Sequence, residues 1–196
     1  MKFLCFGDSN TYGYDPRSYF GDRYEREARW VEILADRLCC TVINMGENGR
    51  EIPCKAWQIA DFNRMLEAEM PVDMLIVMLG TNDLLQGKTV SQIVNRMDYF
   101  LRQIDLNVSC ILLLAPPVLK VGVWVDSLEM VNASVNLNIA YKQLAEDLGV
   151  QFVDTGTWNL SLAFDGVHLT QEGNRAFANG LEDYFRKGEL LCCKSE

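Results

Sequence analysis

Short runs of apolar residues alternate with longer stretches of helical periodicity along most of this chain. The runs predict five strands, at Lys2–Phe6, Thr41–Asn44, Met74–Leu79, Cys110–Ala115 and Val150–Val153. The third and fourth runs are continuously hydrophobic, as is typical of central strands covered by helices on both faces. Strands that alternate with helices indicate a parallel sheet with crossover connections.

Four helices are expected from apolar residues spaced along one helix face. Their core-facing residues are Trp30, Ile33, Leu34 and Leu38; Val94, Met97, Leu101 and Ile104; Leu137, Tyr141, Leu144 and Leu148; and Phe177, Leu181, Tyr184 and Phe185. Ser91 is a candidate N-cap of the second helix, and the last helix is expected to begin near Thr170. The irregular segments Tyr12–Glu27 and Pro116–Asp126 follow strands, at the edge where open α/β sheets bind ligands. The pattern predicts an α/β fold, a three-layer αβα sandwich that forms one domain over residues 1–196.

Composition and charge narrow the classes of partner. The chain has 196 residues, of which 49% are hydrophobic and 23% charged, as in an ordinary globular domain. Its formal net charge of −9 opposes binding to nucleic acid or anionic membranes, which basic patches drive. The longest apolar runs are too short to span a bilayer, and the first strand begins too early to leave room for a signal peptide. We therefore expect a cytoplasmic protein that binds neither nucleic acid nor membrane.

The seven cysteines give no sign of a disulfide framework or a zinc site. Their number is odd, no CxxC spacing occurs, and two pairs are vicinal, Cys39-Cys40 and Cys192-Cys193. Zinc sites commonly use several cysteines and histidines, and this chain has one histidine. Reduced thiols in a cytoplasm are the simplest interpretation.

That single histidine, His168, lies three residues after Asp165 and shortly before the last predicted helix. Ser9 follows the first predicted strand. A serine hydrolase needs a nucleophile, a general base and an acid that orients the base. Here Ser9 would attack a carbonyl carbon, His168 would accept the serine proton, and Asp165 would hold the imidazole. These three are the candidate catalytic residues.

Two further loops follow the second and third strands and bring candidate oxyanion donors to the same edge. Gly49 presents a backbone N–H with no side chain in the way. The Asn82 amide and the Ser9 backbone N–H would complete a three-donor oxyanion hole. Asp8 and Asp83, each next to one of these donors in the sequence, are expected to support the site.

Each of these residues also has a simpler interpretation. A serine after a strand is usually a helix N-cap, and an aspartate such as Asp165 can cap the helix that follows. Gly80-Thr81-Asn82-Asp83 is good turn chemistry, and Gly46 and Gly49 can serve backbone conformation alone. A lone histidine is often only hydrogen-bonded. The coincidence of these signals, in order and at one sheet edge, favours the catalytic interpretation.

Two other classes of function compete with a serine hydrolase. Asp8, Asp83 and Asp165 would provide a carboxylate cluster for Mg²⁺-dependent phosphoryl chemistry. That interpretation leaves Ser9, Asn82 and His168 without necessary roles and lacks a phosphate-binding glycine loop. A catalytically silent binding module is the other class, since fold does not establish activity. The complete set of nucleophile, base, acid and oxyanion donors argues against it, so we expect catalysis without metal or organic cofactor.

The four segments together resemble the SGNH hydrolases, also called the GDSL esterase family. The matching blocks are Gly7-Asp8-Ser9 with Thr11 and Gly13; Asn44-x-Gly46-x-x-Gly49; Gly80-x-Asn82-Asp83; and Asp165-x-x-His168 followed by Leu169-Thr170. The resemblance implies a flavodoxin-like sandwich with five parallel strands. It also implies that Ser9, Gly49, Asn82 and His168 meet in one site, with Gly49 as an oxyanion donor.

A closer likeness is to the bacterial arylesterase and acyltransferase branch of that family. It rests on Cys5–Pro16, on Arg29-Trp30 and on Met78–Asp83. This branch implies a small, mainly acetyl, ester as substrate, acyl transfer in some members, and a homo-oligomer. Carbohydrate O-acetylesterases share the blocks, and lysophospholipases and thioesterases are further alternatives on the same fold.

Aromatic residues in the two irregular segments are candidate walls of a substrate pocket. Tyr12 and Tyr14 lie in the first segment and Trp124 in the second. The alternative is that they pack the loops onto the domain or onto a neighbouring subunit. A short, crowded pocket would favour acetyl groups, whereas an open apolar groove would admit longer chains.

Overall fold

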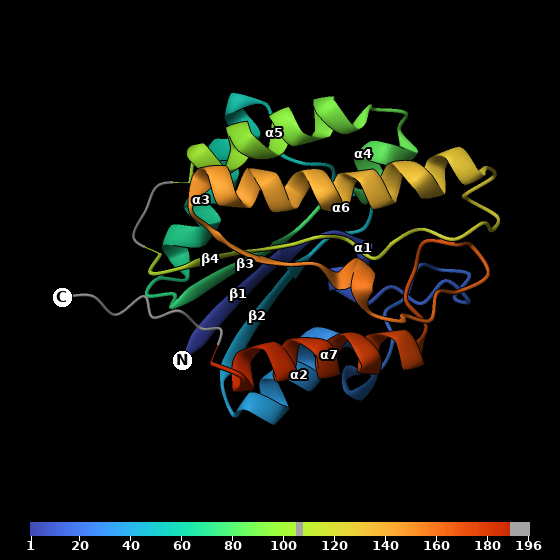
Figure 1. Ribbon diagram of the computed structural model, residues 1–196. Coiled ribbons are helices and arrows are strands. Elements are labelled where there is room, and N and C mark those ends of the chain that lie inside the picture. Colours follow the sequence, from blue (N-terminus) through green and yellow to red (C-terminus); the bar gives the residue numbers. More distant parts are fainter. Residues whose placement is uncertain (105–107, 189–196) are drawn as a thin grey trace.

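A five-stranded parallel sheet lies between two layers of helices in the computed structural model, which describes residues 1–104 and 108–188 (Figure 1). The strands are β1 (Lys2–Gly7), β2 (Thr41–Gly46), β3 (Met74–Met78), β4 (Ile111–Leu114) and β5 (Gln151–Val153). Their order is β2-β1-β3-β4-β5, and every neighbouring pair is parallel. The predicted α/β sandwich is confirmed, and β3 and β4 lie inside the sheet as expected.

Seven α-helices and two short 3-10 helices connect the described strands. They are α1 (Ser9–Tyr12), η1 (Arg26–Ala28), α2 (Trp30–Leu38), α3 (Ala56–Ala68), α4 (Thr81–Leu85), α5 (Val90–Arg102), α6 (Leu128–Leu148), η2 (Thr155–Thr157) and α7 (Gln171–Arg186). The four predicted helices correspond to α2, α5, α6 and α7. Helix α3 was not predicted, because its buried face consists of only Ile59, Phe62 and Leu66.

The two faces of the sheet are buried under different helices (Figure 1). In β1, Leu4 and Phe6 join a cluster with α3, α5 and α6, whereas Phe3 and Cys5 join a cluster with α2 and α7. This alternation follows from the two-residue side-chain period of a strand. The carboxyl ends of all five strands point to one edge, where the candidate site residues begin.

Helix caps agree with the sequence at one position and differ at another. Thr170 is the N-cap of α7 and accepts a hydrogen bond from the backbone N–H of Gly173 at 3.0 Å. The predicted cap Ser91 is wrong: Thr89 caps α5 and forms a capping box with Gln92. In this box the Thr89 side chain accepts the Gln92 backbone N–H, and the Gln92 side chain accepts the Thr89 backbone N–H. Ser91 lies inside the first turn of α5 and is therefore not its cap.

The remaining expectations concern the state of the cysteine thiols and the absence of membrane-spanning helices. Cys5, Cys39, Cys40 and Cys54 carry free thiols. The second vicinal pair, Cys192-Cys193, lies outside the described residues. Within the described ranges, no helix has the length and apolar character needed to cross a membrane.

Candidate active site

Ser9 is positioned by the turn between β1 and α1. Asp8 is the N-cap of α1, and its Oδ1 accepts a hydrogen bond from the backbone N–H of Asn10 at 3.0 Å. Ser9 is therefore the first residue inside the helix and not its cap. Its Oγ lies 2.9 Å from Nε2 of His168, with both side chains buried. The first residue of a helix has no intrahelical acceptor for its N–H, so this group of Ser9 is available to a ligand.

His168 and Asp165 continue the hydrogen-bonded chain from Ser9. Nδ1 of His168 donates to Oδ2 of Asp165 at 2.7 Å. Oδ1 of Asp165 accepts the backbone N–H groups of Val167 and His168 at 2.9 and 3.0 Å. Burial raises the pKa of Asp165, but these hydrogen bonds outweigh burial and lower the pKa below its ordinary value. The ionised carboxylate keeps the proton on Nδ1, which leaves Nε2 free to accept the Ser9 proton.

The candidate oxyanion donors Gly49 and Asn82 lie on the loop after β2 and in α4, which follows β3. Gly49 has φ +76°, a conformation that favours glycine, and a Cβ built there would meet no atom within 4 Å. The Asn82 Nδ2 donates to the backbone carbonyl of Arg50 at 3.0 Å, which ties α4 to the Gly49 loop. Gly46 serves close approach, since a Cβ there would lie 2.1 Å from the backbone nitrogen of Tyr12.

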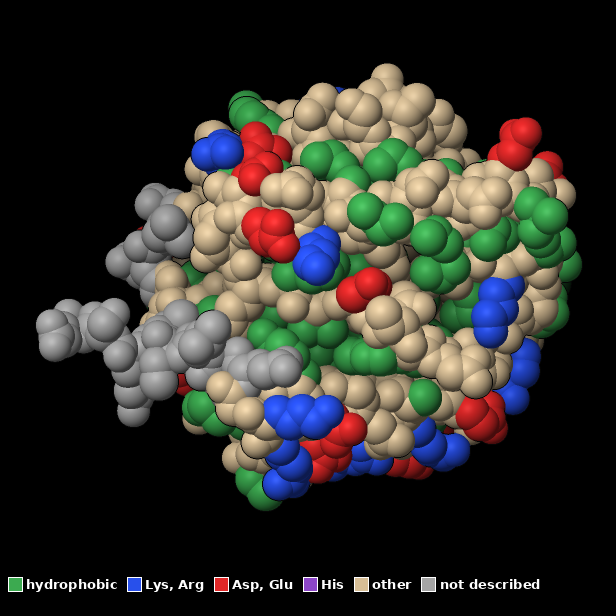
Figure 2. All heavy atoms as spheres, in the orientation of Figure 1, with side chains coloured by type: hydrophobic (Ala, Val, Ile, Leu, Met, Phe, Trp, Pro, Cys, Tyr) green, Lys and Arg blue, Asp and Glu red, His purple; other side chains and the backbone are tan. Residues whose placement is uncertain are grey.

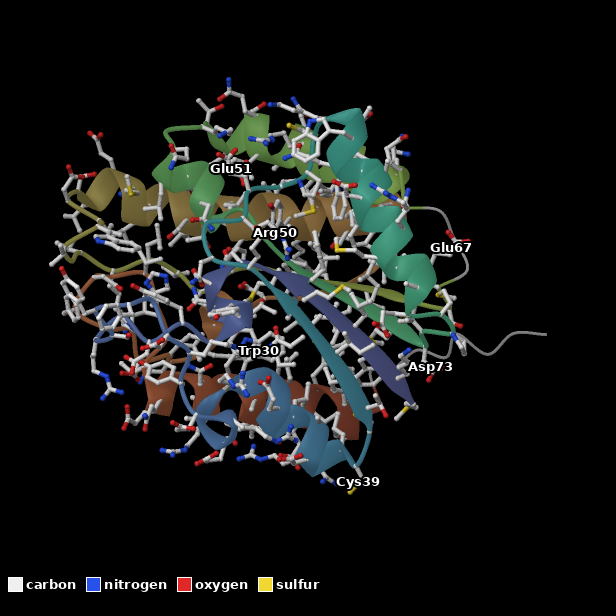
Figure 3. The ribbon with its side chains drawn as sticks, turned by 180° about the vertical axis from the view of Figure 1, so that it is seen from behind. Trp30, Cys39, Arg50, Glu51, Glu67 and Asp73 are labelled. Atoms are coloured by element: carbon white, nitrogen blue, oxygen red, sulfur yellow. The ribbon has the colours of Figure 1, made fainter. Side chains whose placement is uncertain are left out.

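Arg50 anchors the oxyanion loop to the end of the sheet, where Figure 3 shows it beside β1 and β2. Its guanidinium donates to the carbonyl oxygens of Gly7, at 2.8 Å, and Met45. It also pairs with Glu47 at 2.6 Å and lies 4.2 Å from the centre of the Phe6 ring. Burial lowers the pKa of Arg50, and the neighbouring carboxylates oppose that effect. The residue after Gly49 thus fixes the loop through its side chain and its backbone.

Asp83 supports the same loop from the other side. Its fully buried carboxylate accepts the backbone N–H of Ile52 at 3.0 Å and pairs with Arg96 at 2.7 Å. Arg96 also contacts Glu51, at 2.9 Å, and donates to the Ile52 carbonyl at 2.9 Å. Arg50 therefore fixes the Gly49 loop through backbone carbonyls, and the Asp83–Arg96 ion pair holds the residues that follow it.

Asp8 is buried with little compensation for its charge. Burial raises its pKa to about 6, while the Asn10 N–H, His168 and Arg50 act in the opposite direction. In the unfolded chain this carboxyl ionises near 3.8. Between that pH and about 6 the folded protein retains a proton that the unfolded chain has lost, so stability falls as the pH rises through this window.

Asp8→Asn is therefore expected to raise the free energy of unfolding at pH 7.5, by on the order of 2 kcal/mol more than at pH 4.5. The amide oxygen can still accept the Asn10 N–H, so the helix cap is retained. Urea unfolding of both proteins at pH 4.5, 5.5, 6.5 and 7.5 measures the difference. A difference that is constant over this range contradicts a buried, destabilising carboxylate.

Two aromatic rings flank the imidazole. The Tyr14 ring lies 4.6 Å from that of His168, and the half-exposed Trp124 meets the same ring edge-on at 5.1 Å. The Trp124 backbone N–H donates to the Asp165 backbone carbonyl at 3.0 Å, which fixes the loop that carries Trp124 to the segment that carries Asp165 and His168. The Tyr12 ring lies 4.4 Å from the Arg23 guanidinium, within range of a cation–π contact. That Tyr12 lines a substrate pocket stays a prediction.

A groove of about 920 Å³ adjoins the oxyanion loop. Its lining includes Gly49 and Arg50, the side chains of Phe62 and Arg96, and the exposed ring of Trp57. Neither Ser9 nor His168 lines it. The groove therefore extends away from the reacting side chains, beginning at the candidate oxyanion donor.

The three aspartates of the alternative metal site have separate partners. Asp8 caps α1, Asp83 pairs with Arg96, and Asp165 holds His168. In the part of the chain that the structure describes, no group of three or more His, Cys, Asp or Glu side chains is arranged to hold a metal ion. The carboxylate cluster required for the phosphoryl-transfer alternative is thus not formed by these residues.

Sequence reasoning missed three residues that organise the site: Asn10, Arg50 and Arg96. Each bonds at least one backbone carbonyl that is distant in the sequence, and Arg96 also pairs with the Asp83 and Glu51 side chains. Backbone acceptors have no sequence signature, so only the position of Asn10 and Arg50 beside Ser9 and Gly49 offered a signal.

This chain is similar in sequence and fold to known esterases. Residues 5–176 match the GDSL-like lipase/acylhydrolase family. A carbohydrate acetylesterase family member from Sinorhizobium meliloti is 29% identical, with a TM-score of 0.79 over 95% of this chain and 97% of the other. The aryl esterase of M. smegmatis is 25% identical, with a TM-score of 0.81 over 95% of this chain and 98% of the other. No curated protein matches by sequence. With its SGNH-hydrolase fold and the Ser9–His168–Asp165 arrangement, the chain belongs to the GDSL-like lipase/acylhydrolase family and is an esterase of that family.

Proposed function

We propose that this esterase hydrolyses small esters with short acyl groups, with acetyl as the preferred group. Ser9 is the nucleophile, His168 the general base and Asp165 the acid that orients it. The observation that carries the proposal is the continuous hydrogen-bonded chain, 2.9 Å from Ser9 to His168 and 2.7 Å from His168 to Asp165.

In the proposed reaction, Ser9 Oγ attacks the ester carbonyl carbon while its proton passes to Nε2 of His168. Negative charge then develops on the carbonyl oxygen, and the N–H groups of Ser9, Gly49 and Asn82 stabilise it. The imidazolium returns the proton to the leaving alcohol, and an acyl-serine forms. Water repeats the sequence and releases the acid. An alcohol in place of water would give acyl transfer, which we include in the proposal.

The preference for short acyl groups follows from the aromatic rings beside His168. Tyr14 and Trp124 lie within 4.6 and 5.1 Å of the imidazole, on segments fixed to the domain by backbone hydrogen bonds. Rings fixed so near the reacting atoms limit the room for an acyl chain. We therefore expect kcat/KM for p-nitrophenyl esters to fall at least about 10-fold from acetyl to octanoyl.

Steady-state kinetics on the acetyl, butyryl, hexanoyl and octanoyl esters measure this preference. Trp124→Ala should raise kcat/KM for octanoyl relative to acetyl, because it opens one wall. Trp57→Ala is a matched control, because Trp57 is 62% exposed and lines the groove that neither Ser9 nor His168 enters. This variant should leave the ratio of octanoyl to acetyl kcat/KM unchanged. A flat profile in the wild type would contradict the proposed pocket.

A second candidate substrate is an acetylated carbohydrate. The groove that begins at Gly49 supports it, because an exposed tryptophan and polar side chains are the surfaces on which sugars stack and form hydrogen bonds. A similar fold occurs in the S. meliloti carbohydrate acetylesterase family member. Acetate release from acetylated xylose, lost in Trp57→Ala while p-nitrophenyl acetate cleavage persists, would favour the sugar as substrate.

We also propose a cytoplasmic homo-oligomer. The free thiols of Cys5, Cys39, Cys40 and Cys54 fit a reducing compartment. Exposed apolar side chains on the outer face of α6, including Leu128, Val135 and Ile139, offer a surface for another subunit. Hydrophobic side chains appear on this side of the molecule in Figure 2.

A further inference from the structure

We propose that Asn10 is a positioning residue that holds the general base against the nucleophile. Its buried side chain bridges the backbone on both sides of His168. Nδ2 donates to the Val167 carbonyl at 3.2 Å, and Oδ1 accepts the Leu169 N–H at 2.9 Å. This inference rests on the proposed roles of Ser9 and His168.

The bridge joins two segments that are far apart in the sequence. Ser9 and His168 are separated by 159 residues, so their 2.9 Å contact depends on links between β1–α1 and the segment before α7. Because Ser9 and Asn10 are consecutive residues of α1, any link through Asn10 acts on the nucleophile's own helix. Its two hydrogen bonds, to the residues before and after His168, restrain that segment from sliding or tilting relative to α1.

Asn10 is itself held in place through its backbone. Its N–H donates to Asp8, and its carbonyl accepts the indole N–H of fully buried Trp30 at 2.9 Å. The Trp30 backbone N–H in turn donates to the side chain of Asn174, which also bonds the Thr170 carbonyl at the start of α7. The backbone of Asn10 is therefore fixed to α2 and to the start of α7, so its side-chain amide has a defined position beside the His168 segment.

Asp165 and Asn10 restrain different parts of the base. Asp165 bonds Nδ1 and so sets the tautomer and rotation of the ring. Asn10 bonds only the neighbouring backbone and so sets the distance from the ring to Ser9. A displacement of the order of 1 Å between reacting groups can cost about 100-fold in rate, so a backbone restraint has a measurable catalytic effect.

The family's name records a leucine at the corresponding position, since its letters read Gly-Asp-Ser-Leu, whereas this chain reads Gly7-Asp8-Ser9-Asn10. A leucine has the same branching, with two methyl groups in place of the amide oxygen and nitrogen, and forms neither hydrogen bond. Asn10→Leu thus removes both links while a branched side chain still occupies the site. Asn10→Ala removes the links together with the volume.

The test compares these variants with the same two substitutions at Asn138. That asparagine is equally buried, at 4% exposure, and bonds the Pro116 carbonyl at 3.2 Å, away from the Ser9 and His168 segments. Active sites are counted by titration with diethyl p-nitrophenyl phosphate. Ser9 Oγ forms a bond to the phosphorus atom of this reagent, p-nitrophenolate leaves, and His168 receives the serine proton. Rates of p-nitrophenyl acetate cleavage are then expressed per titratable site.

We expect Asn10→Leu to lower kcat per site about 10- to 100-fold with KM within about twofold, and to slow phosphorylation of Ser9 by a similar factor. The Asn138 variants should lose thermal stability but retain kcat per site. Wild-type kcat per site in Asn10→Leu and Asn10→Ala would overturn the positioning role alone. Equal ester cleavage by the wild type and Ser9→Ala would overturn the proposed function as well.

Discussion

Ser9→Ala is expected to lower kcat for p-nitrophenyl acetate by at least about 10⁴-fold. The substitution removes one oxygen atom, the one that lies 2.9 Å from His168 and is proposed to form the acyl-enzyme. Oxyanion donors and binding contacts persist, so a small residual rate above water is expected. Because the helix cap is Asp8 and not Ser9, α1 keeps its N-terminal hydrogen bond and the fold should be retained.

Ser134→Ala is a matched control for this substitution. Ser134 is also buried, and its Oγ accepts the Leu119 N–H at 3.0 Å and donates to the Val131 carbonyl at 2.7 Å. This variant should lose stability but keep its activity per folded molecule. Circular dichroism and thermal unfolding establish that each protein is folded before rates are compared. Undiminished ester cleavage by folded Ser9→Ala would refute the mechanism.

The sheet was predictable because each strand carries a short apolar run that the helical segments interrupt. β3 illustrates this, since Met74–Met78 is buried on both faces and reads as a continuous hydrophobic run. Helix α3 shows the limit: three buried residues in thirteen leave an apolar stripe too narrow to stand out, and its exposed Trp57 blurs the pattern. The missed cap of α5 has a similar cause, because Thr89 and Ser91 are both good capping residues and only backbone geometry distinguishes them.

The hydrogen-bonded contact among Ser9, His168 and Asp165 was predictable because chemistry restricts the residue types of a candidate triad. One histidine in the chain leaves one candidate base, and an aspartate three residues earlier can reach it. The supporting contacts were not predictable, because they end on backbone atoms. Arg50 reaches the Gly7 carbonyl and Asn10 reaches the Val167 carbonyl, and any residue type supplies such an acceptor. The contact between Arg23 and the Tyr12 ring was not predictable for a related reason, because an arginine in an irregular segment gives no periodic signal.

Asp165→Asn is expected to lower kcat by about 10³- to 10⁴-fold, because the amide selects the wrong tautomer of His168. Oδ1 of Asp165 accepts two backbone N–H groups, at 2.9 and 3.0 Å, so the asparagine oxygen must occupy that position. The asparagine NH₂ then replaces Oδ2 and faces Nδ1 of His168. Two donors cannot share this contact. Nδ1 must become the acceptor, which places the imidazole proton on Nε2, pointing at Ser9.

An imidazole in that tautomer donates to Ser9 Oγ and cannot remove its proton. The effect should therefore appear in kcat and in the rate of Ser9 phosphorylation, while KM changes little. Asp154→Asn is a suitable control, because Asp154 also accepts a backbone N–H, that of Gly156 at 2.9 Å, as the cap of η2. A folded Asp165→Asn protein with a wild-type rate would show that the carboxylate does not set the proton on Nδ1. Loss of activity in Asp165→Asn but not in Asp154→Asn ties the rate to the tautomer, since both variants keep their backbone hydrogen bonds.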